Sequence, residues 1–118
     1  MSNDTRPPGK TTVAPEVLVE IARRATLKVK GVSAMAPISG GVNRLFRRGI
    51  VDGVRITIEK DIVYVDLYIV LENNVNIRNI SRTVQQKVTR AITEMVGMEV
   101  EEINIHIEDI AYQSDEDA

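Results

Sequence analysis

The sequence predicts an α+β domain with a two-layer architecture. A four-stranded mixed sheet carries two helices on one face, in the order α-β-β-β-α-β. Two observations support this fold class. Between Asn76 and Gly97 apolar residues recur every three or four positions, which is typical of a helix with one buried face. After Gly97, isoleucines alternate with polar residues up to Ile107, which is the period of a half-buried strand. A strand that follows such a crossover helix is expected to run parallel to a strand of the same sheet.

The first helix is expected to begin at Pro15, because proline suits the first helical turn, and to end before Gly31, which can adopt a left-handed conformation. Basic residues gather toward its C-terminal end, where the helix dipole favours cations. The predicted buried stripe comprises Val17, Leu18, Ile21, Ala22, Ala25 and Val29.

Three strands are expected between the helices. Val32–Ala36 forms the first, and a long connection without a clean period, residues 37–49, follows it. Connections of this length are usually functional or mobile. Val54–Glu59 and Ile62–Leu71 form the second and third strands, and Lys60-Asp61 is expected to join them as a two-residue turn that lacks glycine.

The second helix has clear start and stop signals. Asn76 is a good N-cap, Val75 and Ile80 are placed as a hydrophobic staple, and Gly97 ends the apolar pattern. The predicted buried stripe comprises Ile77, Ile80, Val84, Val88, Ala91, Ile92, Met95 and Val96.

The 118 residues fit a single domain. We expect a disordered N-terminal arm at residues 1–13, a single α+β domain at 14–112 and an acidic disordered tail at 113–118. Because the chain has no cysteine, disulfides, thiolate metal sites and cysteine nucleophiles are excluded, and a cytoplasmic location is expected. No stretch approaches the ~20 apolar residues of a membrane span, so any membrane contact would be peripheral.

The charges are sorted along the chain. Residues 1–50 contain nine Lys or Arg against three Asp or Glu, whereas residues 94–118 contain nine Asp or Glu and no Lys or Arg. Such sorting can produce a dipolar surface that favours self-association. Alternatively, folding mixes the charges in space.

A family resemblance follows from motifs that keep their order and spacing along the chain. These motifs are Pro15-Glu16-Val17, Ile21-Ala22, Gly31-Val32, Gly53-Val54, the Val63–Leu71 strand, Val75-Asn76-Ile77, Val84-Gln85, Val88, Met95-Val96-Gly97-Met98, Val100 and Ile103-Asn104-Ile105. Over about residues 13–112 the chain resembles the alkaline shock protein family of bacterial envelope-stress proteins. One departure is Asn73-Asn74, where the family usually shows Tyr-Gly; asparagine is the next best residue at positive φ.

The resemblance implies a cytoplasmic protein of cell-envelope homeostasis, held near the membrane by a membrane-anchored partner protein. Some members of the family self-associate. The resemblance supplies no catalytic residue and implies no cofactor.

One candidate interaction surface is the segment Arg44, Leu45, Phe46, Arg47 and Arg48 in the long connection. Its apolar pair could lie on a partner or a bilayer interface while the arginines pair with phosphate or carboxylate. The alternative is that Leu45 and Phe46 plug the edge of the core and the arginines stay in water.

The other candidate surface is the open sheet face, with Tyr64, Tyr68 and His106 beside Arg55 and Asn104. Tyrosines beside polar groups are common at protein interfaces, and aromatic residues on a sheet can also stack bases. The acidic pI of about 5.4 and the 3% aromatic content disfavour nucleic acid as the partner. Considered alone, His106 is interpreted as an ordinary exposed strand residue.

Together with the sorted charges, the resemblance therefore implies a non-enzymatic protein of envelope stress that acts by self-association and partner binding near the cytoplasmic membrane face. No cofactor or metal is expected, because the chain has a single histidine and no ligand spacing of a calcium or nucleotide site. The alternative function is a small RNA-binding α+β module that uses the open sheet face and the basic loop.

Overall fold

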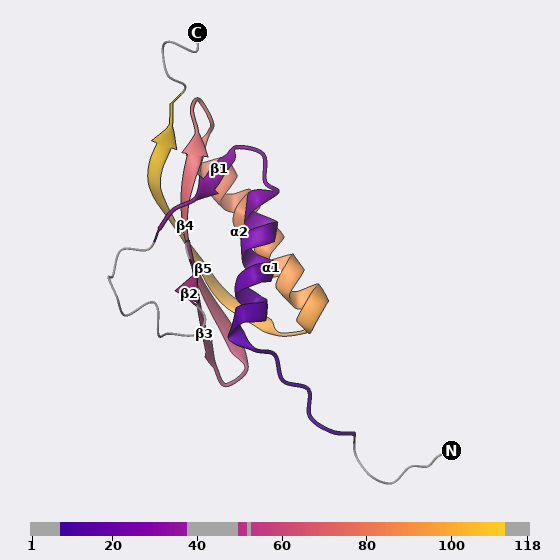
Figure 1. Ribbon diagram of the computed structural model, residues 1–118. Coiled ribbons are helices and arrows are strands. Elements are labelled where there is room, and N and C mark those ends of the chain that lie inside the picture. Colours follow the sequence, from indigo (N-terminus) through magenta and orange to yellow (C-terminus); the bar gives the residue numbers. More distant parts are fainter. Residues whose placement is uncertain (1–7, 38–49, 52, 113–118) are drawn as a thin grey trace.

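The computed structural model describes residues 8–37, 50–51 and 53–112. Two helices and five strands lie within these residues (Figure 1). Their bounds are α1 Pro15–Leu27, β1 Val32–Met35, β2 Ile50–Val51, β3 Val54–Glu59, β4 Ile62–Glu72, α2 Ile77–Val96 and β5 Glu99–Ala111. The predicted arm is described only from residue 8 onward, and the predicted tail, residues 113–118, lies outside the described residues.

Strand β4 is the centre of a mixed sheet. β5 runs parallel to it along its whole length. The other edge of β4 is shared by two strands: β3 is antiparallel to residues 62–67, and β1 is antiparallel to residues 69–71. The two-residue β2 pairs with β3. The structure thus confirms the α+β class and the parallel return of the last strand, and it adds β2 to the four predicted strands.

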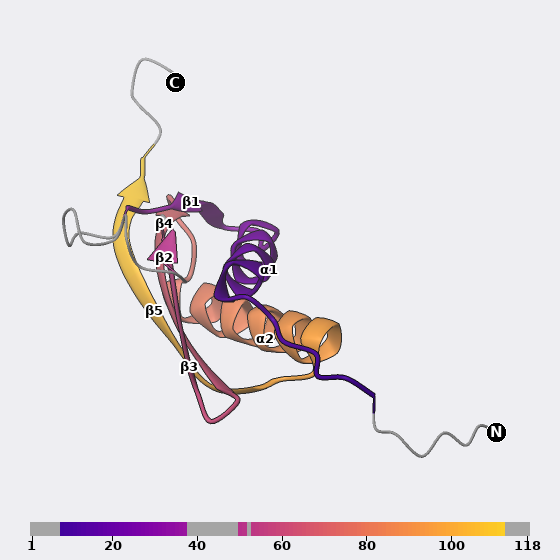
Figure 2. The same cartoon turned by 60° about the horizontal axis from the view of Figure 1, so that its bottom comes forward.

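Both helices cover the same face of the sheet, and the core lies between these two layers (Figure 2). Along β4 the residues of one face are fully buried, whereas the intervening ones are partly exposed. The fully buried apolar residues include Val63, Val65, Leu67, Ile69 and Leu71 of β4, Leu18 and Ala22 of α1, and Val84, Val88 and Ile92 of α2. Each buried Val, Leu or Ile side chain contributes about 1.5–3 kcal/mol, so this contact between helices and sheet holds the fold.

The helix stripes that meet the sheet are narrower than the sequence predicts. Val17 is 46% exposed, Ile77 is 47% exposed and Met95 is 69% exposed, although the apolar pattern predicts that all three are buried. A helix that rests on a single sheet buries only the arc that faces it, and the apolar pattern of each helix is wider than this arc. Val17 and Met95 border the space between the two helices instead.

The predicted turns at residues 60–61 and 73–74 are confirmed. Lys60 and Asp61 have φ values of 53° and 66°, so both adopt the left-handed conformation that a two-residue hairpin of this type needs. Asn74, with a φ of 67°, takes positive φ in place of glycine. Asn76 caps α2 by accepting the backbone N–H of Asn79 at 3.0 Å.

Helix α1 ends at Leu27, earlier than predicted, and Gly31 lies in the turn before β1. Gly31 has a φ of 104°, and a Cβ atom there would lie 2.6 Å from Cδ1 of Ile80. Glycine is therefore required at this position for two reasons: the backbone conformation and the close approach of α2.

Candidate interaction surface on the open sheet face

The open face of the sheet carries the residues of β4 that alternate with the core. Since successive side chains of a strand point to opposite faces, Tyr64, Asp66 and Tyr68 point away from the helices. Neither described helix lies on this side (Figure 2). Two of the three site residues predicted on this face, Tyr68 and His106, meet here.

Tyr68 and His106 form a stacked pair. They are direct neighbours in the parallel β4–β5 register, their ring centroids lie 4.3 Å apart and the ring planes differ by 10°. Stacking of this kind stabilises by about 0.5–1.5 kcal/mol beyond the area that it buries. The sequence taken alone indicates an ordinary exposed residue at His106. The structure shows instead that its ring is held on one side by Tyr68 and at one edge by a carboxylate.

That carboxylate belongs to Asp66, which joins β4 to β5 on this face. Its Oδ1 lies 3.2 Å from Nε2 of His106 and also accepts a hydrogen bond from Nδ2 of Asn104 at 3.2 Å. Arg55 of β3 stands opposite Asp66 in the register, and its guanidinium carbon lies 5.9 Å from the Tyr68 ring centroid. We name Arg55, Asp66, Tyr68, Asn104 and His106 the outer-face cluster.

The outer-face cluster is both fixed and accessible. The side chain of His106 is 39% exposed and that of Asp66 is 26% exposed. Nε of Arg55 is buried and has no hydrogen-bond partner among the described residues. An unpaired buried donor is costly.

Tyr64 lies apart from the cluster. It faces Thr57 on β3 and Glu102 on β5. Partial burial raises the pKa of the Tyr64 phenol above its ordinary value, and the negative charges of nearby glutamates raise it further. These glutamates are Glu101, Glu59, Glu102 and Glu99. Tyr64 therefore stays neutral in an acidic part of the same face, away from Tyr68.

The predicted basic segment, Arg44, Leu45, Phe46, Arg47 and Arg48, lies outside the described residues. The residues that flank it are described, and those on both sides reach Tyr68. The backbone N–H of Ala36 donates to the carbonyl of Tyr68 at 2.8 Å, and the N–H of Tyr68 donates to the carbonyl of Gly53 at 2.8 Å. The chain thus bonds Tyr68 just after β1 and again between β2 and β3.

The outer-face cluster combines aromatic, charged and amide side chains. Within the described residues no group of three or more His, Cys, Asp or Glu side chains could hold a metal ion. Tyrosine and arginine, in contrast, are side chains enriched at protein interfaces.

Comparison with known proteins gives a family match over almost the whole chain. The model of the alkaline shock protein 23 family, described as having a cell envelope-related function, matches residues 3–112. The Bacillus subtilis protein YqhY is 32% identical over 108 residues, which cover 90% of this chain and 80% of YqhY. YloU of the same organism is 24% identical over 106 residues, which cover 86% of this chain and 88% of YloU.

Solved structures share the fold at low sequence identity. One MamM CTD structure superposes with a TM-score of 0.54 and 16% identity, covering 80% of this chain and 95% of that chain. Another MamM CTD structure gives a TM-score of 0.53 at 14% identity, covering 84% and 99% of the two chains. None of the described helices is long and apolar enough to cross a membrane.

Proposed function

Because the chain belongs to the alkaline shock protein 23 family, which has a cell envelope-related function, we propose that it is a non-enzymatic interaction protein of the cytoplasmic membrane face. It associates with itself and binds a membrane-anchored partner protein. The observation that carries this proposal is the outer-face cluster, a fixed group of aromatic and charged side chains that no described helix covers.

The geometry of the cluster suits a protein partner. Side chains that are already held by stacking and hydrogen bonds lose little conformational freedom on binding, so more of the contact energy appears as affinity. Tyr68 and Arg55 are of the residue types that most often dominate binding energy at interfaces.

The same geometry argues against the alternative function of RNA binding. Tyr68 and His106 stack on each other across neighbouring strands, so each ring already uses one of its faces. A base-stacking platform needs free ring faces beside basic side chains. The carboxylates of Asp66 and Glu102 lie on this face as well, and they repel phosphate.

A membrane-binding experiment tests the proposal. Purified protein is sedimented with membranes from its host, with the same membranes after protease treatment, and with protein-free anionic vesicles. We expect binding to the first sample alone, since the partner is a membrane protein. Binding to vesicles alone would indicate direct lipid contact and would overturn the partner proposal.

Variants then locate the binding surface. Tyr68→Ala combined with His106→Ala should abolish membrane binding, whereas Tyr112→Ala, which removes a 70% exposed tyrosine outside the cluster, should not. The melting temperatures of both variants show whether they are folded. If the folded Tyr68→Ala/His106→Ala protein binds membranes as wild type does, the cluster is not part of the binding surface.

The alternative function is tested by measuring RNA binding. RNA binding that collapses as salt rises would favour it.

A further inference from the structure

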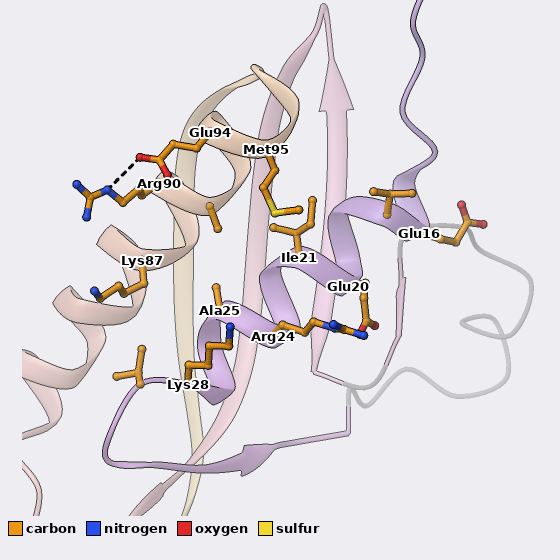
Figure 3. A pocket seen from close by; sticks show the side chains of 13 residues that line it. Glu16, Glu20, Ile21, Arg24, Ala25, Lys28, Lys87, Arg90, Glu94 and Met95 are labelled. Atoms are coloured by element: carbon orange, nitrogen blue, oxygen red, sulfur yellow. Dashed lines mark hydrogen bonds and ion pairs between the residues drawn. The ribbon is translucent and has the colours of Figure 1, made fainter.

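A second surface lies on the opposite layer of the molecule. Between α1 and α2 an open groove of about 870 Å³ is lined by residues of the two helices and the turn that follows α1 (Figure 3). Its floor is apolar and includes Ile21, Ala25 and Ala91. Val17 and Met95 stand at its border, 46% and 69% exposed.

The exposed apolar residues of this groove remain in contact with water in a lone domain. Val17 and Met95 belong to the apolar patterns of their helices but do not reach the sheet. Contiguous exposed apolar surface with a polar rim marks a protein contact site. The helix layer therefore carries more apolar surface than its own sheet can bury.

The charged rim of the groove is divided between its two ends. Lys28 and Lys87 lie at one end, and Glu94 lies near the C-terminal end of α2, with its carboxylate turned toward Arg90 (Figure 3). Glu20, Arg24 and Arg90 also line the groove, and Glu20 pairs with Arg24 at 2.6 Å. Within the described part of the chain Lys28 and Lys87 form no ion pair, whereas Glu94 pairs with Arg90 at 3.3 Å. Lys28 and Lys87 are thus cations without an ion pair among the described residues, whereas the carboxylates of Glu20 and Glu94 each pair with an arginine that also lines the groove.

We infer that the groove binds a second copy of this chain, with the two helix layers packed face to face about a two-fold axis. The inference rests on the proposed self-association and assigns its surface. A two-fold axis across the groove brings Lys28 and Lys87 of one copy toward Glu20 and Glu94 of the other, so each of these paired carboxylates gains a second cation from the other copy. Val17 and Met95 of each copy are then covered by the helix layer of the other.

The size of this contact fits a reversible dimer. At 1.5 Å per residue the 13 residues of α1 span about 20 Å and the 20 residues of α2 about 30 Å. Two adjacent helices of this length present roughly 500 Å² per copy, below the ~800 Å² of a standard interface. The outer sheet faces point away from such a contact, so each copy keeps its outer-face cluster available for the membrane partner.

The apolar part of the contact is tested by Val17→Glu combined with Met95→Glu. Sedimentation equilibrium should show a concentration-dependent dimer for wild type and an at least tenfold higher dissociation constant for the variant, on the order of 1.4 kcal/mol. Ile77→Glu is the matched control, because Ile77 is 47% exposed on the same helix as Met95 and lies outside the groove. A folded double variant that dimerises as wild type would overturn the inference.

The charged part is tested by mixing two variants. Lys28→Glu with Lys87→Glu makes the rim acidic, and Glu20→Lys with Glu94→Lys makes it basic. Each variant alone should be monomeric, while an equimolar mixture should form a heterodimer. Melting curves confirm that both are folded. A mixture of folded monomers would contradict the two-fold arrangement.

The outcomes separate this inference from the proposed function. If wild type self-associates and only Tyr68→Ala/His106→Ala abolishes the assembly, self-association stands and the groove is not its surface. If wild type is a monomer at every concentration, both the groove contact and the proposed self-association fail. Loss of the dimer in the groove variants with intact membrane binding is the expected result.

Discussion

Glu20 holds two arginines on one carboxylate at the surface of α1. Its Oε2 lies 2.8 Å from Nη2 of Arg23 and 2.6 Å from Nε of Arg24. The hydrogen bonds from Arg23 and then Arg24 lower the pKa of the Glu20 carboxyl from 4.5 to about 2. The side chain of Glu20 is 42% exposed, so solvent screens these ion pairs. The ion pairs therefore stabilise the folded state only modestly.

The depressed pKa of Glu20 predicts an acid-sensitive contribution to stability. Because the folded-state pKa lies below the unfolded value, the contribution is complete above pH 4.5 and is lost as pH falls from 4.5 toward 2. Glu20→Gln should therefore flatten the decline of the melting temperature across this range. An equally steep decline in the variant would show that other carboxylates account for the acid sensitivity. Glu108→Gln, at an exposed position of β5, serves as the control.

Single residues also show how far the candidate site could be predicted. Tyr68 and His106 can be selected as site residues from the sequence because aromatic and titratable side chains on an exposed strand face are informative by type. Asp66, which binds both His106 and Asn104, can be assigned from the sequence only to that face. Its contacts with His106 and Asn104 depend on the register of β4 against β5. That register is set by pairing between distant parts of the chain and cannot be read from the spacing of residues.

Among the elements, two turns contain a glycine at positive φ with different surroundings. Gly97, with a φ of 73°, ends α2 and has no atom within 4 Å of where a Cβ would be. Gly31, with a φ of 104°, would place a Cβ 2.6 Å from Cδ1 of Ile80. Gly97 is needed for its backbone conformation alone, whereas Gly31 is needed for its backbone conformation and for packing.

Alanine at these two positions separates the effects. Gly97→Ala should lower the free energy of unfolding by about 1 kcal/mol, the cost of a left-handed residue with a Cβ. Gly31→Ala should cost more, about 2–3 kcal/mol, since overpacking adds to the strain. Urea denaturation measures both. Adding Ile80→Ala should remove part of the Gly31→Ala penalty, and strict additivity would mean that the contact with Ile80 is unimportant.

The β3–β4 hairpin offers a stabilising change. Lys60 and Asp61 both adopt positive φ without glycine, a conformation that Asn-Gly adopts more readily. Lys60→Asn with Asp61→Gly should stabilise the domain by roughly 0.5–1 kcal/mol and raise the melting temperature by a few degrees. Differential scanning calorimetry checks this, and a lower melting temperature would contradict it.

The helices and strands could be predicted because a helix or strand with one buried face repeats apolar residues at a fixed spacing along the sequence. The stripes of α1 and α2 and the buried face of β4 all follow from it. Two features could not be predicted in this way. The sharing of one β4 edge by β3 and β1 is a matter of tertiary pairing, and the exposure of Val17 and Met95 depends on how wide an arc the sheet covers.

At the scale of the whole molecule, charge and apolar surface divide between two layers. The helix layer carries the groove, whose rim holds lysines, arginines and carboxylates, and the sheet layer carries the outer-face cluster. Two layers with different chemistry can bind two different neighbours at once. The proposed self-association and the proposed membrane partner would each use one of these layers.

Self-association is expected to depend on ionic strength. At 0.1 M salt charges are screened beyond about 10 Å, and at 1 M beyond about 3 Å, so complementary charges should hold copies together less strongly as salt rises. Light scattering after size-exclusion chromatography should show a shift from dimer toward monomer between these conditions. A dimer that strengthens with salt would indicate a purely apolar contact.

The meeting of β1 and β3 on one edge of β4 has a practical consequence for engineering. Since the carbonyl of Tyr68 accepts from Ala36 and its N–H donates to Gly53, the chain from Ala36 to Gly53 begins and ends at the same place on one edge of β4. When residues are added to a loop closed in this way, the entropic cost of closing it rises only slowly with length. A reporter domain inserted within residues 38–49 would leave every described strand ladder intact, and it would report on binding at the open sheet face from a position tethered beside it.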